Sequence, residues 1–290
     1  MSSFDLHLHT NWSYDAFSAV SDYFRFAAAK SLRAIAFTDH HLMDAYDEVL
    51  ECAVRFPEVP FFAGSEVTVN TPFGPMDIVC LNLPVKPTEE LNRTFDFYRQ
   101  WQLDFGAALS EKLCSLGIPL DDAARMEFLK SYRPVPAIKK QGNTHIAFEK
   151  LVEYCRKNSD LIPDAQALSK IWYEVNDVYP YPAYDLILPR LKAEGGVFFI
   201  AHPFGYFQKN DRKRMDHLRE ILMLDGIECA HPHIPAEMTV VYRQYCLEHN
   251  LLSSAGSDMH SPDFEKFAAL DAPDVWLDEI LERVTLHRGC

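Results

Sequence analysis

The sequence predicts an α/β protein whose strands form a mostly parallel sheet closed into a barrel. Short apolar runs typical of buried strands recur along the chain, and most of them alternate with stretches of helical periodicity. Alternating strands and helices favour a parallel sheet. Most of the apolar runs also end abruptly in His, Asp or Glu. Because the functional residues of a β/α barrel gather at the carboxyl ends of its strands, we expect a barrel with its site on that face.

The first run, FDLHLHTNWSYD at positions 4–15, has two different faces. One face is apolar, whereas the other carries Asp5, His7 and His9, with Asp15 just past the turn. Side chains at positions i and i+2 of a strand point the same way and lie about 6 to 7 Å apart. His7 and His9 can therefore converge on one small ligand.

Further runs and helical stretches continue the alternation. The runs are RAIAFTDHH (33–41), VPFFAGSE (59–66), MDIVCLNL (76–83), GGVFFIAHP (195–203), DGIECAHPH (225–233) and LLSSAGSDMH (251–260). The helical stretches are 18–30, 42–56, 211–224 and 235–249, the last opened by a proline at a first-turn position. The polar ends of the strands are therefore expected at one mouth of the barrel.

Residues 85–190 interrupt this alternation. A long helical pattern begins near Thr88 and stops at Gly117, and shorter helical patterns follow at 121–131, 146–157 and 164–174. We expect a single domain, 1–290, with a mainly helical insertion at about 85–190 above the catalytic face. The pattern leaves open whether this insertion is a lid or a plain structural cap.

Composition limits the classes of partner. A chain of 290 residues that is 48% hydrophobic can bury a substantial core. Its net charge of −14 counts against a broad surface for duplex nucleic acid, but metal ions can supply positive charge locally to an anionic substrate. The sequence has no apolar window of about 18 residues, no secretory signal at MSSFD and no CxxC pair among its seven cysteines. We expect a cytoplasmic protein without a membrane partner.

The polar residues at the strand ends predict a metal-binding site. A lone His on an apolar strand is ordinarily a core or surface residue, but HxH at 7/9 and DxH at 258/260 are same-face pairs. Burying such groups without a partner costs several kcal/mol for each ionised group. Mixed imidazole and carboxylate ligands suit Zn, Mn or Fe, and the set is larger than one tetrahedral site needs. We therefore expect two or three clustered divalent metal ions.

Four of these motifs resemble those of the PHP (polymerase and histidinol phosphatase) family. DLHLHTNWSYD resembles its first motif, FTDHH the second, AHP the third and GSDMH the fourth. GIECAHPHIPAE is similar to the stand-alone branch with a helical insertion, which includes nucleotide phosphatases and 5′-to-3′ oligoribonucleotide exonucleases. The resemblance implies a distorted, TIM-like (β/α)7 barrel with a two- or three-metal centre at its C-terminal face. The ligands that it implies are His7, His9, Asp15, His40, Glu66, His202, Asp258 and His260.

At three positions the assignment has an ordinary alternative. Relatives usually carry a further His where this chain has Asp77, which is either a ninth ligand or a solvent-facing residue at the end of a hairpin. His145, in GNTHIAFEKL, resembles a His that contacts substrate phosphate at a helix start, where free N–H groups favour an anion; the alternative is an ordinary polar residue in the first turn of a helix. Relatives often have Arg at the place of Asn143. His233 is a second candidate for substrate phosphate, or a turn residue, and the pattern assigns no role to His231.

The expected activity is metal-dependent hydrolysis of a phosphoric ester by a metal-bound hydroxide. Asp15, Asp258 and His260 are the candidate catalytic residues. The expected substrate is a small phosphorylated compound, a nucleotide or a short single-stranded oligonucleotide, rather than duplex nucleic acid. Two alternatives stay open: a histidinol-phosphate phosphatase, and a non-catalytic metal-binding PHP module.

Overall fold

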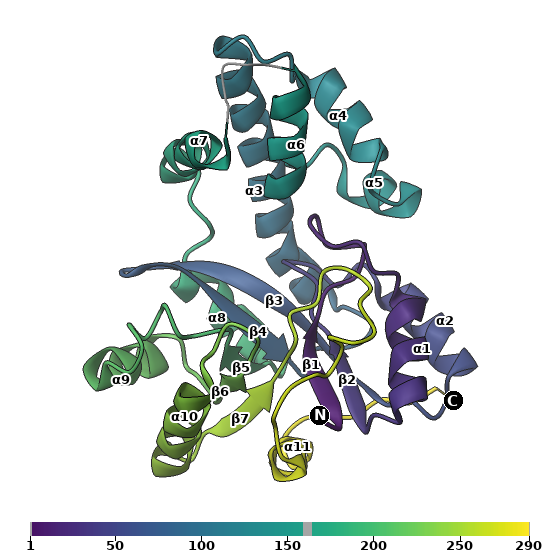
Figure 1. Cartoon of the computed structure of the whole chain (residues 1–290), viewed down its shortest axis with the longest axis vertical. Coiled ribbons are helices and arrows are strands. Elements are labelled where there is room, and N and C mark those ends of the chain that lie inside the picture. The colour runs from purple at the N-terminus through teal and green to yellow at the C-terminus, as the bar shows by residue number, and fades with distance from the viewer. Residues whose placement is uncertain (1, 159–163, 290) are drawn as a thin grey trace.

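The computed structural model describes residues 2–158 and 164–289. Seven strands form one sheet in chain order (Figure 1). They are β1 (Phe4–Leu8), β2 (Ala34–Phe37), β3 (Phe61–Thr71), β4 (Gly74–Leu81), β5 (Val197–Ile200), β6 (Gly226–Ala230) and β7 (Leu252–Ala255). A parallel bridge between Leu8 and Met259 brings the two edges of the sheet together. The predicted distorted (β/α)7 barrel is confirmed.

The strand β4 is the exception to parallel pairing. It runs antiparallel to both β3 and β5, whereas the other neighbouring strands are parallel. The β3–β4 pair is a tight hairpin that closes at Thr71 and Gly74. The expectation that the third run ends at Glu66 is wrong, because pairing with β4 continues β3 for five residues beyond it. Since β4 runs the other way, its first half, with Asp77, lies near the carboxyl ends of its parallel neighbours.

Helices surround the barrel and complete its core. They are α1 (Val20–Lys30), α2 (Tyr46–Arg55), α8 (Tyr184–Ala193), α9 (Arg212–Ile221), α10 (Ala236–His249) and α11 (Asp274–Leu281). The core includes fully buried aromatic side chains such as Phe37, Phe61 and Phe199. The sequence pattern predicts α1, α2, α9 and α10 to within a few residues but not α8 or α11. Ile187 and Leu191 of α8 pack into the same core.

Of the six helices that the structure describes between β4 and β5, all but α8 rise from one end of the barrel (Figure 1). They are α3 (Glu89–Ser115), α4 (Asp122–Lys130), α5 (Val135–Gln141), α6 (Phe148–Asn158) and α7 (Ala165–Val178). Thr88, Asp121 and Asp164 begin three of them, because each side chain accepts a backbone N–H of the first turn. Helix α3 has 27 residues, about 40 Å at 1.5 Å per residue, and its first half packs on the barrel core.

The helices α3 to α7, called the upper helices below, have a hydrophobic core of their own. Phe105, Leu109 and Leu113 from the second half of α3 pack there with residues of the helices that follow, among them Leu151 and Leu168. This second cluster spans residues 101–175, a narrower stretch than the expected insertion at 85–190. Among the described residues, no helix is both long and apolar enough to cross a membrane.

Candidate metal centre

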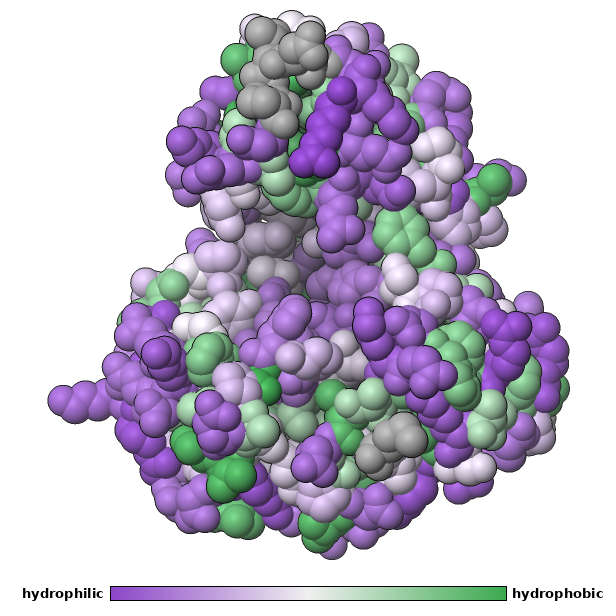
Figure 2. All heavy atoms as spheres, in the orientation of Figure 1, coloured by the Kyte–Doolittle hydropathy of each residue, from purple (hydrophilic) through white to green (hydrophobic). Residues whose placement is uncertain are grey.

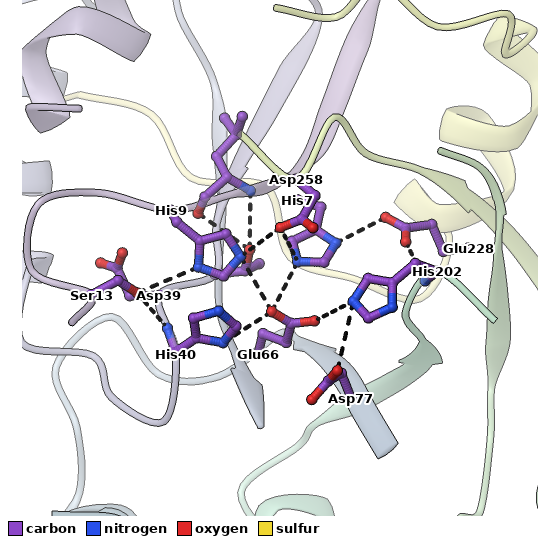
Figure 3. A network of polar contacts seen from close by, with 12 residues as sticks. His7, His9, Ser13, Asp39, His40, Glu66, Asp77, His202, Glu228 and Asp258 are labelled. Atoms are coloured by element: carbon purple, nitrogen blue, oxygen red, sulfur yellow. Dashed lines mark hydrogen bonds and ion pairs between the residues drawn. The ribbon is translucent and has the colours of Figure 1, made fainter. Parts of the chain in front are cut away.

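The polar residues at the strand ends meet at one point (Figure 3). His7 lies in β1 and His9 directly follows it; His40 follows β2 and His202 follows β5. Asp258 and His260 follow β7, and Glu66 lies within β3 where β2 ends. The barrel thus brings together residues that are as far apart as 250 positions in the sequence.

Glu66 is the centre of this cluster (Figure 3). Its Oε2 lies 3.1 Å from His7 Nε2, 3.2 Å from His9 Nε2 and 3.1 Å from His40 Nδ1. Its Oε1 lies 3.2 Å from His202 Nε2. The carboxylate is fully buried, so four imidazoles are its immediate polar surroundings.

Two further carboxylates flank the imidazoles. Asp258 Oδ1 lies 3.1 Å from His9 Nε2 and 3.5 Å from His7 Nε2. Asp15 Oδ2 lies 3.4 Å from His40 Nε2 and 3.5 Å from His260 Nε2. The loop between β1 and α1 therefore delivers Asp15 to the cluster, as the first motif predicts.

The backbone near the cluster is strained at the strand ends. His202, Asp258 and His41 have φ angles of 31°, 52° and 62°, in the left-handed region that residues with a side chain rarely adopt. Such conformations cost of order 1–3 kcal/mol each and gather at functional sites. Gly256 allows the closest approach, since a Cβ there would lie 2.1 Å from His7 Cβ and 2.6 Å from Glu228 Oε1.

Glu228 orients the ligands although the sequence pattern assigns it no role. Its Oε1 lies 3.0 Å from His7 Nδ1, and its Oε2 accepts the backbone N–H of His202 at 2.6 Å. An imidazole whose Nδ1–H binds a carboxylate presents the lone pair of Nε2 to a metal. The only sequence signal for this role is a charged residue in the middle of the apolar run GIECA.

Asp77 lies in the cluster and is held by two hydroxyl groups. Thr68 donates to its Oδ1 at 2.6 Å and Tyr206 donates to its Oδ2 at 2.6 Å, while His202 Nε2 lies 3.8 Å from Oδ2. Because Thr68 gives its hydroxyl hydrogen to Asp77, the 2.9 Å contact between His41 Nε2 and Thr68 Oγ1 has the imidazole as donor. Asp77 is therefore not a solvent-facing residue at a hairpin end, and its role as a ninth ligand stays a prediction.

Attraction between the buried imidazoles and carboxylates sets the protonation state of each group in the cluster. Burial lowers the pKa of His40, but Asp15 and Glu66 outweigh it and raise that pKa to about 10. Burial likewise opposes protonation of His202, yet the bond to Glu66 raises its pKa to about 9. Burial would raise the pKa of Glu66, but the charges of His7 and His40 hold it well below its usual range. Buried carboxylates here require a compensating positive charge.

The nitrogen and oxygen atoms of the cluster are arranged for binding metal ions rather than for hydrogen bonds to one another. Three groups each hold their possible ligand atoms within 4.8 Å of one another: His9, His40 and His260; His7, His9, Glu66 and Asp258; Glu66, Asp77 and His202. Nε2 of His7 and His9, Nδ1 of His40, Oε2 of Glu66 and Oδ1 of Asp258 are buried without an aligned hydrogen-bond partner among the described residues. Buried polar atoms are rarely left so, and divalent cations shared between these groups would satisfy them.

Two cavities open beside the cluster, where the molecule is hollowed between the upper helices and the barrel (Figure 2). The larger, of about 800 Å³, is lined by all three candidate catalytic residues, Asp15, Asp258 and His260. The smaller, of about 450 Å³, is lined by residues that include Glu66 and Asp77. Tyr14, Phe148, Trp172 and Asp258 line both cavities.

The two candidates for substrate phosphate are placed differently. His233 is exposed and lines the larger cavity. His145 precedes α6 and is fully buried, with its ring 4.3 Å from that of Tyr14 and its pKa lowered to about 3 by burial. It lies behind the cavity wall rather than on it. Since packing against the upper helices decides this, the sequence pattern gives no signal for it.

His231, to which the sequence pattern assigns no role, also belongs to the site. Its ring is buried and lines the larger cavity. Its Nδ1 accepts the backbone N–H of His233 at 3.0 Å, so a neutral ring carries its hydrogen on Nε2. Nε2 lies 3.5 Å from Asp258 Oδ2 without an aligned partner among the described residues.

A TIM-like barrel with His and carboxylate ligands at the carboxyl ends of its strands is the architecture of a metal-dependent hydrolase. The sequence matches the PHP domain over residues 5–159. The chain belongs to the PHP family. A comparison with curated protein sequences finds no match.

Two solved structures share the whole fold. One is an amidohydrolase from Chromobacterium violaceum with bound sulfate and no metal, 20% identical, with a TM-score of 0.75 over 100% of this chain and 99% of that one. The other, from Bifidobacterium adolescentis, is assigned as a metal-dependent phosphoesterase; it is 22% identical, with a TM-score of 0.73 over 97% of this chain and 96% of that one. At these identities the likeness establishes the fold.

Proposed function

We propose that this protein is a metal-dependent phosphoesterase that hydrolyses a terminal phosphate or a phosphodiester of a small phosphorylated substrate. Nucleotides and short single-stranded oligonucleotides are the candidate substrates. The observation that carries the proposal is a buried His–carboxylate cluster, centred on Glu66, that opens into a cavity of about 800 Å³.

The donor set suits two or three divalent ions, because its three groups share members. Glu66 belongs to two of the groups, and so does His9. Divalent cations bound there supply Lewis acidity, which lowers the pKa of a coordinated water and neutralises phosphoryl oxygens. Mn, Zn and Fe match the mixture of imidazole and carboxylate ligands.

The side chains at the cavity wall have separate tasks. Asp15 and Asp258 are carboxylates that burial alone would leave protonated, but neighbouring imidazoles hold the pKa of each well below its usual range. Both therefore stay ionised and can accept a hydrogen bond from an attacking water. His231 presents Nε2–H to the same cavity, where it can donate a hydrogen bond to a substrate oxygen.

Substrate size follows from charge and shape. The chain carries a net charge of −14, and the cluster lies inside a cavity rather than along an open basic groove. A terminal phosphate that enters a cavity suits this site better than a duplex that needs many Lys and Arg contacts to phosphate. We expect long duplex DNA not to be cleaved.

The test is phosphate release by the Mn²⁺-loaded protein from nucleoside bisphosphates, short 5′-phosphorylated oligonucleotides and histidinol phosphate. Elemental analysis should find at least two transition-metal ions per chain, and Asp258→Asn should abolish turnover. The matched control is Asp271→Asn, an exposed carboxylate away from both cavities.

The three functions under comparison give different results. Turnover of histidinol phosphate alone favours the phosphatase of that substrate. A folded, metal-loaded protein that releases phosphate from no member of the panel contradicts the proposal and favours a non-catalytic module. Efficient internal cutting of closed circular DNA contradicts the expected substrate size.

A further inference from the structure

The smaller cavity, of about 450 Å³, lies on the side of the cluster formed by Glu66, Asp77 and His202. Its outer wall comes from the upper part of the molecule. Ser169, Trp172 and Asn176 of α7 line it, together with Tyr181 from the segment between α7 and α8. Two turns of one helix thus face the candidate metal centre across a space large enough for a small organic group.

Among the described residues that line this cavity, the groups that can carry positive charge are the imidazoles of His40 and His202, and both already face carboxylates of the cluster. No Lys or Arg is among the described residues that line it, and its charged members away from the imidazoles are carboxylates. The larger cavity differs, since Lys266 lines it. On the side of the cavity away from the cluster, an anionic group would meet no Lys or Arg among the described residues. The part of a ligand that lies against α7 and Tyr181 is therefore expected to be uncharged.

The same wall offers hydrogen-bonding groups. Asn176 Oδ1 is buried with no partner among the described residues. Tyr14 and Tyr181 also line this wall, and a phenol hydroxyl group can donate or accept a hydrogen bond. A buried polar group without a partner costs about 1–3 kcal/mol, which a ligand with matching groups removes.

The side chains of this wall indicate the chemical class of the ligand that fits it. A side-chain amide both donates and accepts, and so does an alcohol hydroxyl. The indole of Trp172 adds an apolar surface beside these polar groups, which suits the C–H face of a hydroxylated carbon chain. Sugars and polyols have this mixture of hydroxyl groups and C–H surface.

We propose that the smaller cavity binds the uncharged, polyhydroxylated alcohol part of the phosphoester, a sugar or polyol group, with Asn176 and Tyr181 reading its hydroxyl groups. This inference rests on the proposed phosphoesterase function and names its substrate class. Sites built to hydrogen-bond a hydroxyl group discriminate strongly against analogues that lack it, because their buried polar groups are then left unpaired.

The experiment compares esters that share a phosphate and differ in the alcohol. Glycerol 3-phosphate, ribose 5-phosphate and glucose 6-phosphate are measured against butyl phosphate with the Mn²⁺-loaded protein, by phosphate release and by calorimetric binding. At least one hydroxylated ester should exceed butyl phosphate by about 100-fold in kcat/KM or in affinity. Asn176→Leu, which keeps the side-chain size, should raise KM and Kd for that ester about tenfold or more and so reduce or abolish its advantage over butyl phosphate.

The control variant is Asp177→Leu, the exposed neighbour on α7 that lines neither cavity. Equal affinity for hydroxylated and alkyl esters overturns the inference, as does an Asn176→Leu protein with unchanged KM and Kd. A preference that appears only after a nucleobase is added also overturns it, because the cavity would then read a heterocycle. Selective binding without any turnover keeps the sugar site and contradicts the phosphoesterase function instead.

Discussion

Gly256 allows His7 and Glu228 to lie in their present positions because it has no side chain. A Cβ at this position would collide with His7 Cβ and Glu228 Oε1, so any larger residue displaces these two side chains. We expect Gly256→Ala to lower the free energy of unfolding by about 1–3 kcal/mol through overpacking. Displacing His7 by about 1 Å should also lower turnover about 100-fold.

Elemental analysis, kinetics and thermal unfolding of Gly256→Ala check this expectation. Gly205→Ala is the control, because a Cβ at Gly205 meets nothing within 4 Å. Normal metal content and turnover in the Gly256→Ala protein would show that His7 does not need its present position.

We predict that Asp77 sets the metal preference of the third candidate ligand group. The family resemblance implies a His at this position, and here the hydroxyl groups of Thr68 and Tyr206 donate to the two oxygens of Asp77. A carboxylate is a harder ligand than an imidazole and favours Mn or Mg over Zn. We expect Asp77→Ala to lower metal content and activity together, and Asp77→His to raise the preference for Zn over Mn.

Competition between Zn²⁺ and Mn²⁺, read by elemental analysis, measures the effect of Asp77→His. Asp271→Ala serves as the exposed control. An Asp77→Ala protein with the metal content and kinetics of the wild type would show that Asp77 is not a ligand and would leave eight candidate ligands.

At the scale of elements, Arg133 joins the upper helices to the barrel. It lies between α4 and α5, where its buried guanidinium donates to the backbone oxygen of Trp12 at 2.9 Å and to Gln141 Oε1 at 2.6 Å. Trp12 belongs to the loop that carries Asp15. Among the described residues Arg133 forms no ion pair, so these hydrogen bonds hold it.

We expect Arg133→Ala to lower the free energy of unfolding by about 1–3 kcal/mol, because buried acceptors lose their donor. Turnover should fall as well, since the loop that positions Asp15 loses its contact with the helices. Thermal unfolding and hydrogen exchange of residues 10–19 measure both effects. Arg156→Ala, at an exposed position of α6, is the control. Unchanged exchange in this loop would refute the coupling.

For the whole molecule, the cluster links metal binding, protons and stability. His40 and His202 have pKa values raised to about 10 and about 9 from 6.5. In the metal-free protein the stability that these protonated imidazoles contribute is complete below pH 6.5 and is lost as pH rises through 9 to 10. Carboxylates with lowered pKa, such as Glu66, act in the opposite direction and lose their contribution in acid.

A bound cation replaces those protons, so apparent Mn²⁺ affinity should rise with pH between 6.5 and 10. We expect the melting temperature with chelator to fall over this range, and the gain from added Mn²⁺ to grow. Unfolding scans at several pH values, with and without Mn²⁺, test this. A gain from Mn²⁺ that is constant with pH would mean that protons and metal do not compete at this site.

Much of the fold and of the cluster can be predicted because it depends on local periodicity. Alternation in the first run places His7 and His9 on one face whatever the rest of the chain does. Polar residues at the ends of successive parallel strands meet because strand direction is shared. The reversed β4 and the extension of β3 beyond Glu66 follow from pairing between the two strands, which no single run reveals.

The sequence by itself determined the barrel class and the His and carboxylate residues that end its strands, because these depend on the order of residues within short segments. Only the tertiary structure decided that Glu228 supports His7, that His145 lies behind the cavity wall and that α7 faces the cluster. These contacts join segments far apart in the chain. Their side chains are placed by packing and by the pairing of buried charges, and both depend on the whole barrel and its upper helices at once.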